Sequence, residues 1–280
     1  MMRPSITTLC TVLLVFGALG LASDRTARAQ STQFLVLAPD RGFLGNEEMR
    51  DVFEAFREHV PESALAFATY DRTAANIEKA LATLASNGDE VVVLPFFLST
   101  RHALYQKVHA VLEDMDVRIA EPFGRSYLAE EILFDRVEAL SERPAGEALV
   151  VVAYGAASEE DARAIRDDVQ PLVERARQKY GLAAADVTVH YARSAPEEAS
   201  RAAFGAGIER VRELASRHER VLVVPFNLGM RYTTMMADWH WTHQRLHGIE
   251  GVVADGQGVL PHENALRWLR RTANGYRPIA

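Results

Sequence analysis

The chain contains one cysteine in 280 residues, Cys10, which lies in an apolar segment near the N-terminus. The rest of the sequence has no thiol. This excludes disulfide bonds, cysteine metal ligands and a thiolate nucleophile from any site there. Such a protein must be stabilised by its apolar core, and a hydrophobic content of 48% is ordinary for a globular chain.

A positive charge excess is also absent. The formal net charge is -7 and the pI is about 5.8, which argues against general nucleic-acid binding. The two G-x-G stretches, at 205–207 and 256–258, do not continue into a dinucleotide-binding fingerprint. Neither a phosphate-binding P-loop nor a nucleophile elbow occurs in the sequence. We therefore expect no nucleotide cofactor.

Long apolar runs are confined to the N-terminus. The run from Leu9 to Ala22 follows Arg3 and precedes an A-x-A sequence that ends at Ala29. This is the pattern of a secretory signal peptide, with an uncleaved anchor as the alternative. We expect cleavage to remove residues 1–29 and to leave a soluble protein without a membrane span. It would be exported to the periplasm or the extracellular space.

Short apolar runs rich in β-branched residues alternate with amphipathic helical patterns along the rest of the chain. Such runs are typical of strands covered on both faces. The order βαβαβαβα occurs twice, which predicts an α/β fold of two similar halves. Each half would be a parallel four-stranded sheet with helices on both faces. We place the halves at 30–144 and 145–280 and expect a pseudo-symmetric monomer. The expected strands are 34–38, 64–69, 91–95, 117–120, 148–153, 187–191, 221–225 and 251–254.

An internal repeat supports this division. The stretch "VVVLPFFLSTRH" ends in the first half at His102, and "VLVVPFNLGMRY" ends in the second half at Tyr232. Both read as a buried strand, a proline and a loop that leads into a helix. Arg101 matches Arg231 in this alignment, whereas His102 is matched by Tyr232. A repeated unit of this kind indicates a duplicated domain.

Charged side chains follow three of the strands expected in the first half. Asp40 and Arg41 follow the first strand, Asp71 the second, and Arg101 and His102 the third. In open parallel sheets, ligands bind beyond the carboxyl ends of the strands. Imidazole and carboxylates suit a divalent metal, and guanidinium groups suit a polycarboxylate or phosphate ligand. Structural roles remain open: a helix-end hydrogen bond for the histidine, a cap for Asp71 and a salt bridge for the arginine.

These stretches resemble the class II metal chelatases of tetrapyrrole synthesis, the sirohydrochlorin cobalt or iron chelatase family. The family's strand, proline, apolar pair and Gly-Arg-His loop correspond to "VVVLPFFLSTRH", with Ser99 and Thr100 replacing the glycine-containing step. The family's second-strand acid corresponds to Asp71 in "TYDRTAANIEKAL". The stretch "EPFGRSYLAEEILFDRV" resembles the loop after the fourth strand and the closing helix. The resemblance extends over both halves.

The resemblance implies a lyase that inserts Co²⁺ or Fe²⁺ into sirohydrochlorin or a related tetrapyrrole, in the cleft between the halves. His102 and Asp71 would bind the metal and accept the pyrrole protons. The family's His-Gly-Ser after the first strand is replaced by residues 38–40, Ala-Pro-Asp, and by 153–155, Ala-Tyr-Gly, in the second half. Asp40 would then supply the missing ligand. The groups expected to bind the carboxylate arms of the substrate are Arg41, Arg101, Arg231 and Tyr232.

The replaced histidine leaves two other functions open. One is a non-catalytic exported protein that carries a metal, haem or a tetrapyrrole on the same scaffold. The other is a two-lobed exported receptor for a small anion. Turnover indicates the chelatase, a stoichiometric colour indicates the carrier, and a colourless complex indicates the receptor.

A second group of histidines occurs in "DWHWTHQRLH". His240, His243 and His247 have the spacing of one helix face. His262 follows the last expected strand, at the mouth of the second half. These four side chains are candidates for a second metal or haem site, and a solvated helix face is the alternative.

Overall fold

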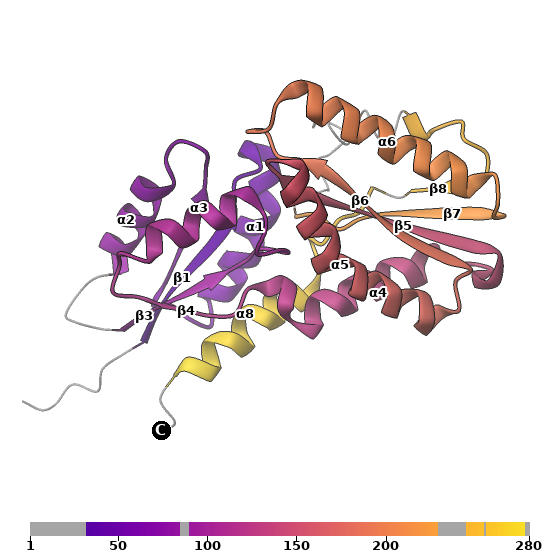
Figure 1. Ribbon diagram of the computed structural model, residues 1–280. Helices are drawn as coiled ribbons and strands as arrows, with labels where there is room; N and C mark the ends of the chain where they lie inside the picture. The colour runs from indigo at the N-terminus through magenta and orange to yellow at the C-terminus, as the bar shows by residue number, and fades with distance from the viewer. Residues whose placement is uncertain (1–31, 85–89, 229–244, 255, 278–280) are drawn as a thin grey trace, which may run out of the picture.

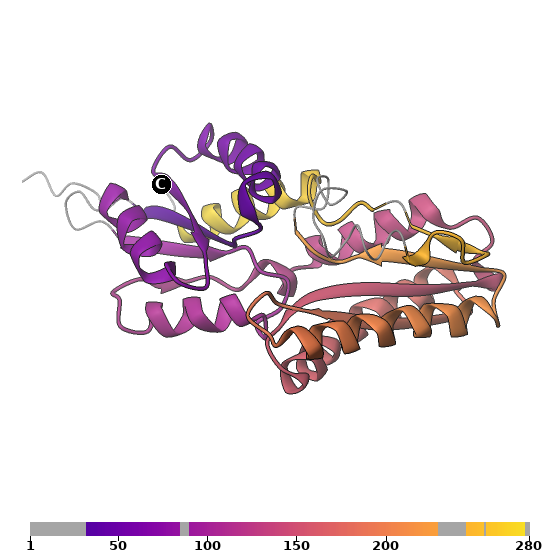
Figure 2. The same ribbon diagram turned by 90° about the horizontal axis from the view of Figure 1, so that it is seen from above.

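The computed structural model describes residues 32–84, 90–228, 245–254 and 256–277. The chain forms two parallel four-stranded sheets, one in each half of the molecule (Figures 1 and 2). Their strand orders are β2-β1-β3-β4 and β6-β5-β7-β8, so the two sheets have the same topology. The predicted α/β fold of two similar halves is confirmed.

All eight expected strands form, with bounds that differ from the predicted ones by three residues at most. The elements of the first half are β1 (Thr32–Pro39), α1 (Gly42–Arg57), β2 (Ser63–Ala68), α2 (Thr73–Leu84), β3 (Glu90–Pro95), α3 (Ala103–Leu112), β4 (Arg118–Ile119), the 3₁₀ helix η1 (Phe123–Arg125) and α4 (Tyr127–Leu140). Those that follow are η2 (Pro144–Gly146), β5 (Glu147–Ala156), α5 (Glu159–Tyr180), β6 (Ala184–Tyr191), α6 (Glu197–Ala215), β7 (Arg220–Pro225), β8 (Val252–Val253) and α8 (Glu263–Tyr276).

The central strand β1 shows why these strands have no polar face. Phe34 and Val36 point to one side of the sheet, where α1 packs, and Leu35 and Leu37 point to the other, where α2 and α3 pack. All four side chains are completely buried. β1 also pairs in parallel with β2 on one edge and β3 on the other. A strand enclosed on every side requires the continuous apolar run seen in the sequence.

The closing helix of each half packs on the sheet of the other half. Figure 1 shows α8 beneath the first sheet and α4 beneath the second. Trp268 of α8 lies edge-on to Phe96 and Phe123 of the first half, with ring centroids 5.6 and 5.3 Å away. In the other direction, the Tyr180 hydroxyl of α5 donates a hydrogen bond to the Phe134 carbonyl of α4 at 3.1 Å. The exchange joins the cores of both halves into one apolar cluster.

A buried carboxylate fixes the connection between the halves. Glu147 is fully buried at the start of β5 and accepts hydrogen bonds from the Ser141 hydroxyl and the backbone N–H groups of Glu142 and Arg143. Arg220 donates to the same carboxylate at 2.9 Å. Burial alone would raise the pKa of Glu147, but these donors outweigh it and lower the pKa. The linker is therefore held as part of the fold.

Candidate active site between the two halves

The carboxyl ends of both sheets point toward the middle of the molecule (Figure 1). The loops after β1, β2 and β3 of the first half therefore meet the loops after β5 and β6 of the second half. Ligands of open parallel sheets bind at such ends. The site predicted in the first half thus adjoins the equivalent end of the second half.

His102 lies at this boundary and forms the N-cap of α3. Its Nδ1 accepts a hydrogen bond from the backbone N–H of Leu104 at 3.1 Å, and the side chain is buried beside Phe97. Burial, and then the positive charge of Arg41, lower the pKa of His102 to about 3 because both disfavour the imidazolium form. His102 is therefore neutral at physiological pH. Since Nδ1 is an acceptor, its proton is on Nε2.

Gly155, at the end of β5, accommodates the imidazole of His102. A Cβ atom at position 155 would lie 2.2 Å from Cδ2 of the ring, which no real contact allows. The backbone of Gly155 also has a φ of +118°, a region that favours glycine. Gly155 belongs to residues 153–155, which replace the family's His-Gly-Ser in the second half. The contact therefore places this stretch against His102 of the first half.

Arg41 and Tyr154 make a second contact across the boundary. The Arg41 guanidinium carbon lies 4.2 Å from the centroid of the Tyr154 ring, within the range of a cation–π interaction. The backbone N–H of Arg41 donates to the Asn46 side chain at 2.8 Å. The Nε atom of Arg41 is buried and finds no hydrogen-bond partner within the described residues. Arg41 therefore retains donor capacity at the boundary, as expected of a ligand-binding arginine.

Tyr70 joins the two halves at the next pair of strand ends. Its hydroxyl lies beside the Ser194 side chain and the Arg193 backbone, in the loop after β6. Burial and then the neighbouring Tyr154 raise the pKa of Tyr70 to about 12, so the phenol keeps its proton at neutral pH. Sequence analysis did not single out either residue for the site. Their equivalent positions after the second strand of each half are the signal that could have identified them.

Asp168 of α5 ties two first-half loops to the second half. Its carboxylate accepts a hydrogen bond from the Ser99 hydroxyl at 2.8 Å and lies 3.5 Å from the Thr100 hydroxyl. Arg125 of η1 pairs with its other oxygen at 3.5 Å. The Ser99 hydroxyl in turn accepts the backbone N–H of Arg101. Ser99 and Thr100, which replace the glycine-containing part of the family's loop, thus anchor the loop that carries His102.

The expected metal ligands are not assembled as a set. In the part of the chain that the structure describes, no group of three or more His, Cys, Asp or Glu side chains is placed to hold a metal ion. The Asp40 carboxylate accepts from the Gly42 N–H at 3.1 Å and from the Asn46 amide at 2.6 Å, so it orders the start of α1. Asp71 is exposed in the turn before α2. The metal-binding roles of His102, Asp71 and Asp40 remain predictions.

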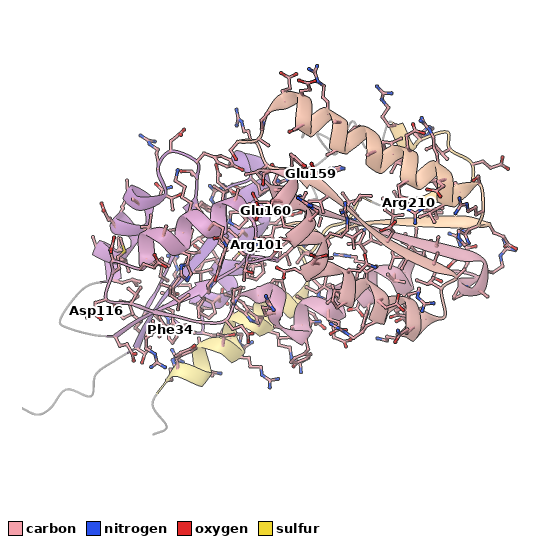
Figure 3. The ribbon with its side chains drawn as sticks, in the orientation of Figure 1. Phe34, Arg101, Asp116, Glu159, Glu160 and Arg210 are labelled. Carbon is pink, nitrogen blue, oxygen red and sulfur yellow. The ribbon has the colours of Figure 1, made fainter. Side chains whose placement is uncertain are left out.

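The other predicted site residues fall into three groups. Arg101 is exposed near the middle of the molecule, where Figure 3 labels it. His262 caps α8 through Nδ1, and its Nε2 lies 3.1 Å from the Asp135 carboxylate of α4. His247 is exposed. The predicted residues that lie outside the described part of the chain are Arg231, Tyr232, His240, His243 and the signal segment 1–29.

Two hollows lie elsewhere, along the outer edges of the sheets. A hollow of about 730 Å³ follows the edge strand β2, and one of about 430 Å³ follows the edge strand β6. Arg210 in the second hollow is paired with Asp186 and Glu213. These hollows do not involve the loops at the facing carboxyl ends. The boundary between the halves therefore remains the candidate site.

Comparison with known proteins agrees with this geometry. Residues 43–140 match the family model for CbiX. Sirohydrochlorin chelatase structures have the same fold at 14% to 15% sequence identity with this chain. SirB from Bacillus subtilis with Fe³⁺ has a TM-score of 0.56 at 14% identity, covering 89% of this chain and 100% of its own. CbiX, described as the terminal enzyme for siroheme biosynthesis in denitrifying bacteria, has a TM-score of 0.56 at 15% identity, covering 88% and 100%.

A larger protein shares the fold as well. DR2241 from Deinococcus radiodurans, described as a multi-domain protein with structural similarity to chelatases, has a TM-score of 0.54 at 18% identity. The match covers 89% of this chain and 56% of that protein. No curated protein matches the sequence. Residues 43–140 thus resemble CbiX, and the chain has the fold of the sirohydrochlorin chelatase structures. No helix within the described residues is long and apolar enough to span a membrane.

Proposed function

We propose that this protein inserts a divalent metal, Co²⁺ or Fe²⁺, into sirohydrochlorin or a related tetrapyrrole held between its halves. The observation that carries the proposal is the position of His102. It lies in the segment that matches CbiX, at the carboxyl end of β3, and faces the strand end of the other half. A neutral imidazole is the form that binds a metal.

Metal insertion needs a ligand that releases the ion and a base that accepts two pyrrole protons. The proposal gives these tasks to His102 together with Asp71, whose exposed carboxylate is available to a substrate. Asp40 already accepts two hydrogen bonds, so it would join only if the start of α1 rearranged. Arg41 and Arg101 supply positive charge for the carboxylate arms of the macrocycle. The metal is a substrate here. The solved relatives are described with Fe³⁺ and with cobalt.

Binding without turnover is the second candidate, and one observation favours it. The lone pair of neutral His102 is on Nδ1, where it accepts the Leu104 N–H. To bind a metal through Nε2, the ring must transfer its proton and give up this cap. A pKa of about 3 also makes His102 a weak base at neutral pH. A carrier of a metal, haem or a tetrapyrrole needs no base, and a carrier of a metal-free tetrapyrrole needs no metal ligand either.

The rate of metal insertion separates the two candidates. Purified protein would be mixed with sirohydrochlorin and Co²⁺ or Fe²⁺, and the Soret and Q bands would be followed over time. A chelatase produces many equivalents of metallated product, and His102→Ala abolishes the gain over the protein-free reaction. His102→Asn is the matched variant because its side-chain oxygen can still cap α3. A spectral shift that ends at about one equivalent, with no acceleration, indicates the carrier.

We also propose that the protein acts after export and as a monomer. The motif that ends at Ala29 supports cleavage there. A single chain already supplies both halves of the site, which supports the monomer. Sequencing the N-terminus of the protein recovered from the periplasm should give Gln30 as its first residue. An intact N-terminus in the cytosol would contradict export, and a dimeric mass in light scattering would contradict the monomer.

A further inference from the structure

Arg41 is a cation held from both sides of the boundary. Its backbone is fixed in the first half through Asn46, and its guanidinium lies on the Tyr154 ring of the second half. No carboxylate pairs with Arg41 among the residues described. The nearest one in sequence, Asp40, is engaged by Gly42 and Asn46. A positive charge is therefore fixed beside the predicted metal-binding histidine.

The fixed charge disfavours a second cation at the same place. It lies close to His102, since both groups contact the same ring: the Arg41 guanidinium carbon is 4.2 Å from the Tyr154 centroid, and the His102 ring centroid is 6.0 Å from it. A dication bound to the ring would experience the same repulsion with twice the charge. The buried Nε of Arg41, without a partner in the described residues, can instead donate to an anion. Charge-assisted bonds from arginine to carboxylate are among the stronger hydrogen bonds in proteins.

We propose that Arg41 binds one carboxylate arm of the tetrapyrrole and thereby orders the reaction, with the macrocycle binding before the metal. Neutralisation of Arg41 by the carboxylate removes the repulsion that keeps a dication away from His102. The inference rests on the proposed function, because it assigns a substrate group and a binding order to the same site.

Two equilibrium titrations of the purified protein test the inference without turnover. One follows Co²⁺ alone by calorimetry. The other follows metal-free uroporphyrin, a macrocycle that carries carboxylate arms, by fluorescence. The variants are Arg41→Met, which removes the charge, and Arg41→Lys, which retains it. Arg118→Met is the matched control, because Arg118 also lies over a tyrosine ring, 4.8 Å from the centroid of Tyr276, at the opposite end of the sheet.

Opposite changes in the two affinities are expected for Arg41→Met. Uroporphyrin affinity should fall by about tenfold or more, the usual range for a lost charged hydrogen bond. Co²⁺ affinity should rise several-fold, because the repulsion is gone. Arg41→Lys should bind Co²⁺ as weakly as the wild type. Arg118→Met should leave both affinities within about twofold, the scatter expected for an exposed site.

The outcomes separate the inference from the proposed function. Unchanged uroporphyrin binding in Arg41→Met overturns the carboxylate contact and leaves the function standing. Unchanged Co²⁺ affinity in that variant overturns the binding order. A wild-type protein that binds no uroporphyrin contradicts both the inference and the proposed function. Circular dichroism of each variant ensures that only folded protein is compared.

Discussion

The imidazole of His102 packs directly on the backbone of Gly155, and this contact joins the two halves at the predicted site. The histidine belongs to the repeat of the first half, and the glycine to the first-strand end of the second half. The space between them is too small for any side chain at position 155. The site is therefore a property of the whole chain, although the CbiX match ends at residue 140.

Gly155→Ala should destabilise the protein strongly. The new Cβ would collide with His102, and a positive φ costs a further 1 to 2 kcal/mol or so. We expect a loss of about 3 kcal/mol or more in the free energy of unfolding, measured in urea. Gly181→Ala is the control, since Gly181 has a φ of +71° and open space around its Cβ position. Equal losses in both variants would show that the contact with His102 is loose.

The low pKa of His102 predicts acid sensitivity. Its pKa is about 3 in the folded protein and about 6.5 in the unfolded chain, so the unfolded chain takes up the proton first as the pH falls. Stability should therefore decrease below about pH 6.5, by up to about 1.4 kcal/mol per pH unit. His102→Asn keeps a cap for α3 and removes this dependence. Urea unfolding at pH 7 and pH 4.5 should show a drop for the wild type that exceeds that of the variant by about 2 kcal/mol. Identical drops would mean that the ring is accessible to protons.

Asp168 should act as a positioning residue for the loop that carries His102. Asp168→Ala removes the acceptor of the Ser99 hydroxyl, and we expect a stability loss of about 1 to 2 kcal/mol. In a double-mutant cycle with Ser99→Ala, the coupling energy should be about 1 kcal/mol. The exposed neighbour Asp167→Ala is the control and should change little. Additive stability losses, with no coupling energy, would argue against an interaction between Ser99 and Asp168.

Trp268→Ala should destabilise the first half of the molecule, although Trp268 lies near the C-terminus of the chain. The tryptophan packs on Phe96 and Phe123, which stack on each other with centroids 4.3 Å apart. A large buried aromatic replaced by alanine costs about 3 to 5 kcal/mol. Hydrogen exchange should accelerate in the amides of β1 and β3. Trp268→Phe keeps a ring and should lose less. Acceleration confined to the second half would contradict the helix exchange.

The sequence was sufficient to predict the fold because each strand carries its own signal. Runs such as that of β1 are apolar on both faces. The repeated strand–proline–loop sequence, which ends at His102 and again at Tyr232, defines two equivalent halves. The helix exchange could not be predicted in this way. Both α4 and α8 have one apolar face, and an apolar face does not specify which of two similar sheets it covers. Trp268 selects the first half only through its fit to Phe96 and Phe123, which is a tertiary contact.

The candidate site was predicted only in part for the same reason. The positions of Arg41 and His102 follow from the strand ends, and both lie at the boundary. The roles of their neighbours depend on contacts between the halves, which no local pattern encodes. Asp40 turns inward to order the start of α1, and Asp168 lies in the middle of a helix that looks ordinary in sequence.

The initial rate of Co²⁺ insertion into sirohydrochlorin by Tyr154→Leu tests the account most directly. Tyr154 belongs to the second half, outside the segment that matches CbiX, and contacts Arg41 and His102. If the two halves form one site, the rate gain over the protein-free reaction should fall by about tenfold or more. A rate equal to that of the wild type would contradict the account, because the first half alone would then carry the chemistry.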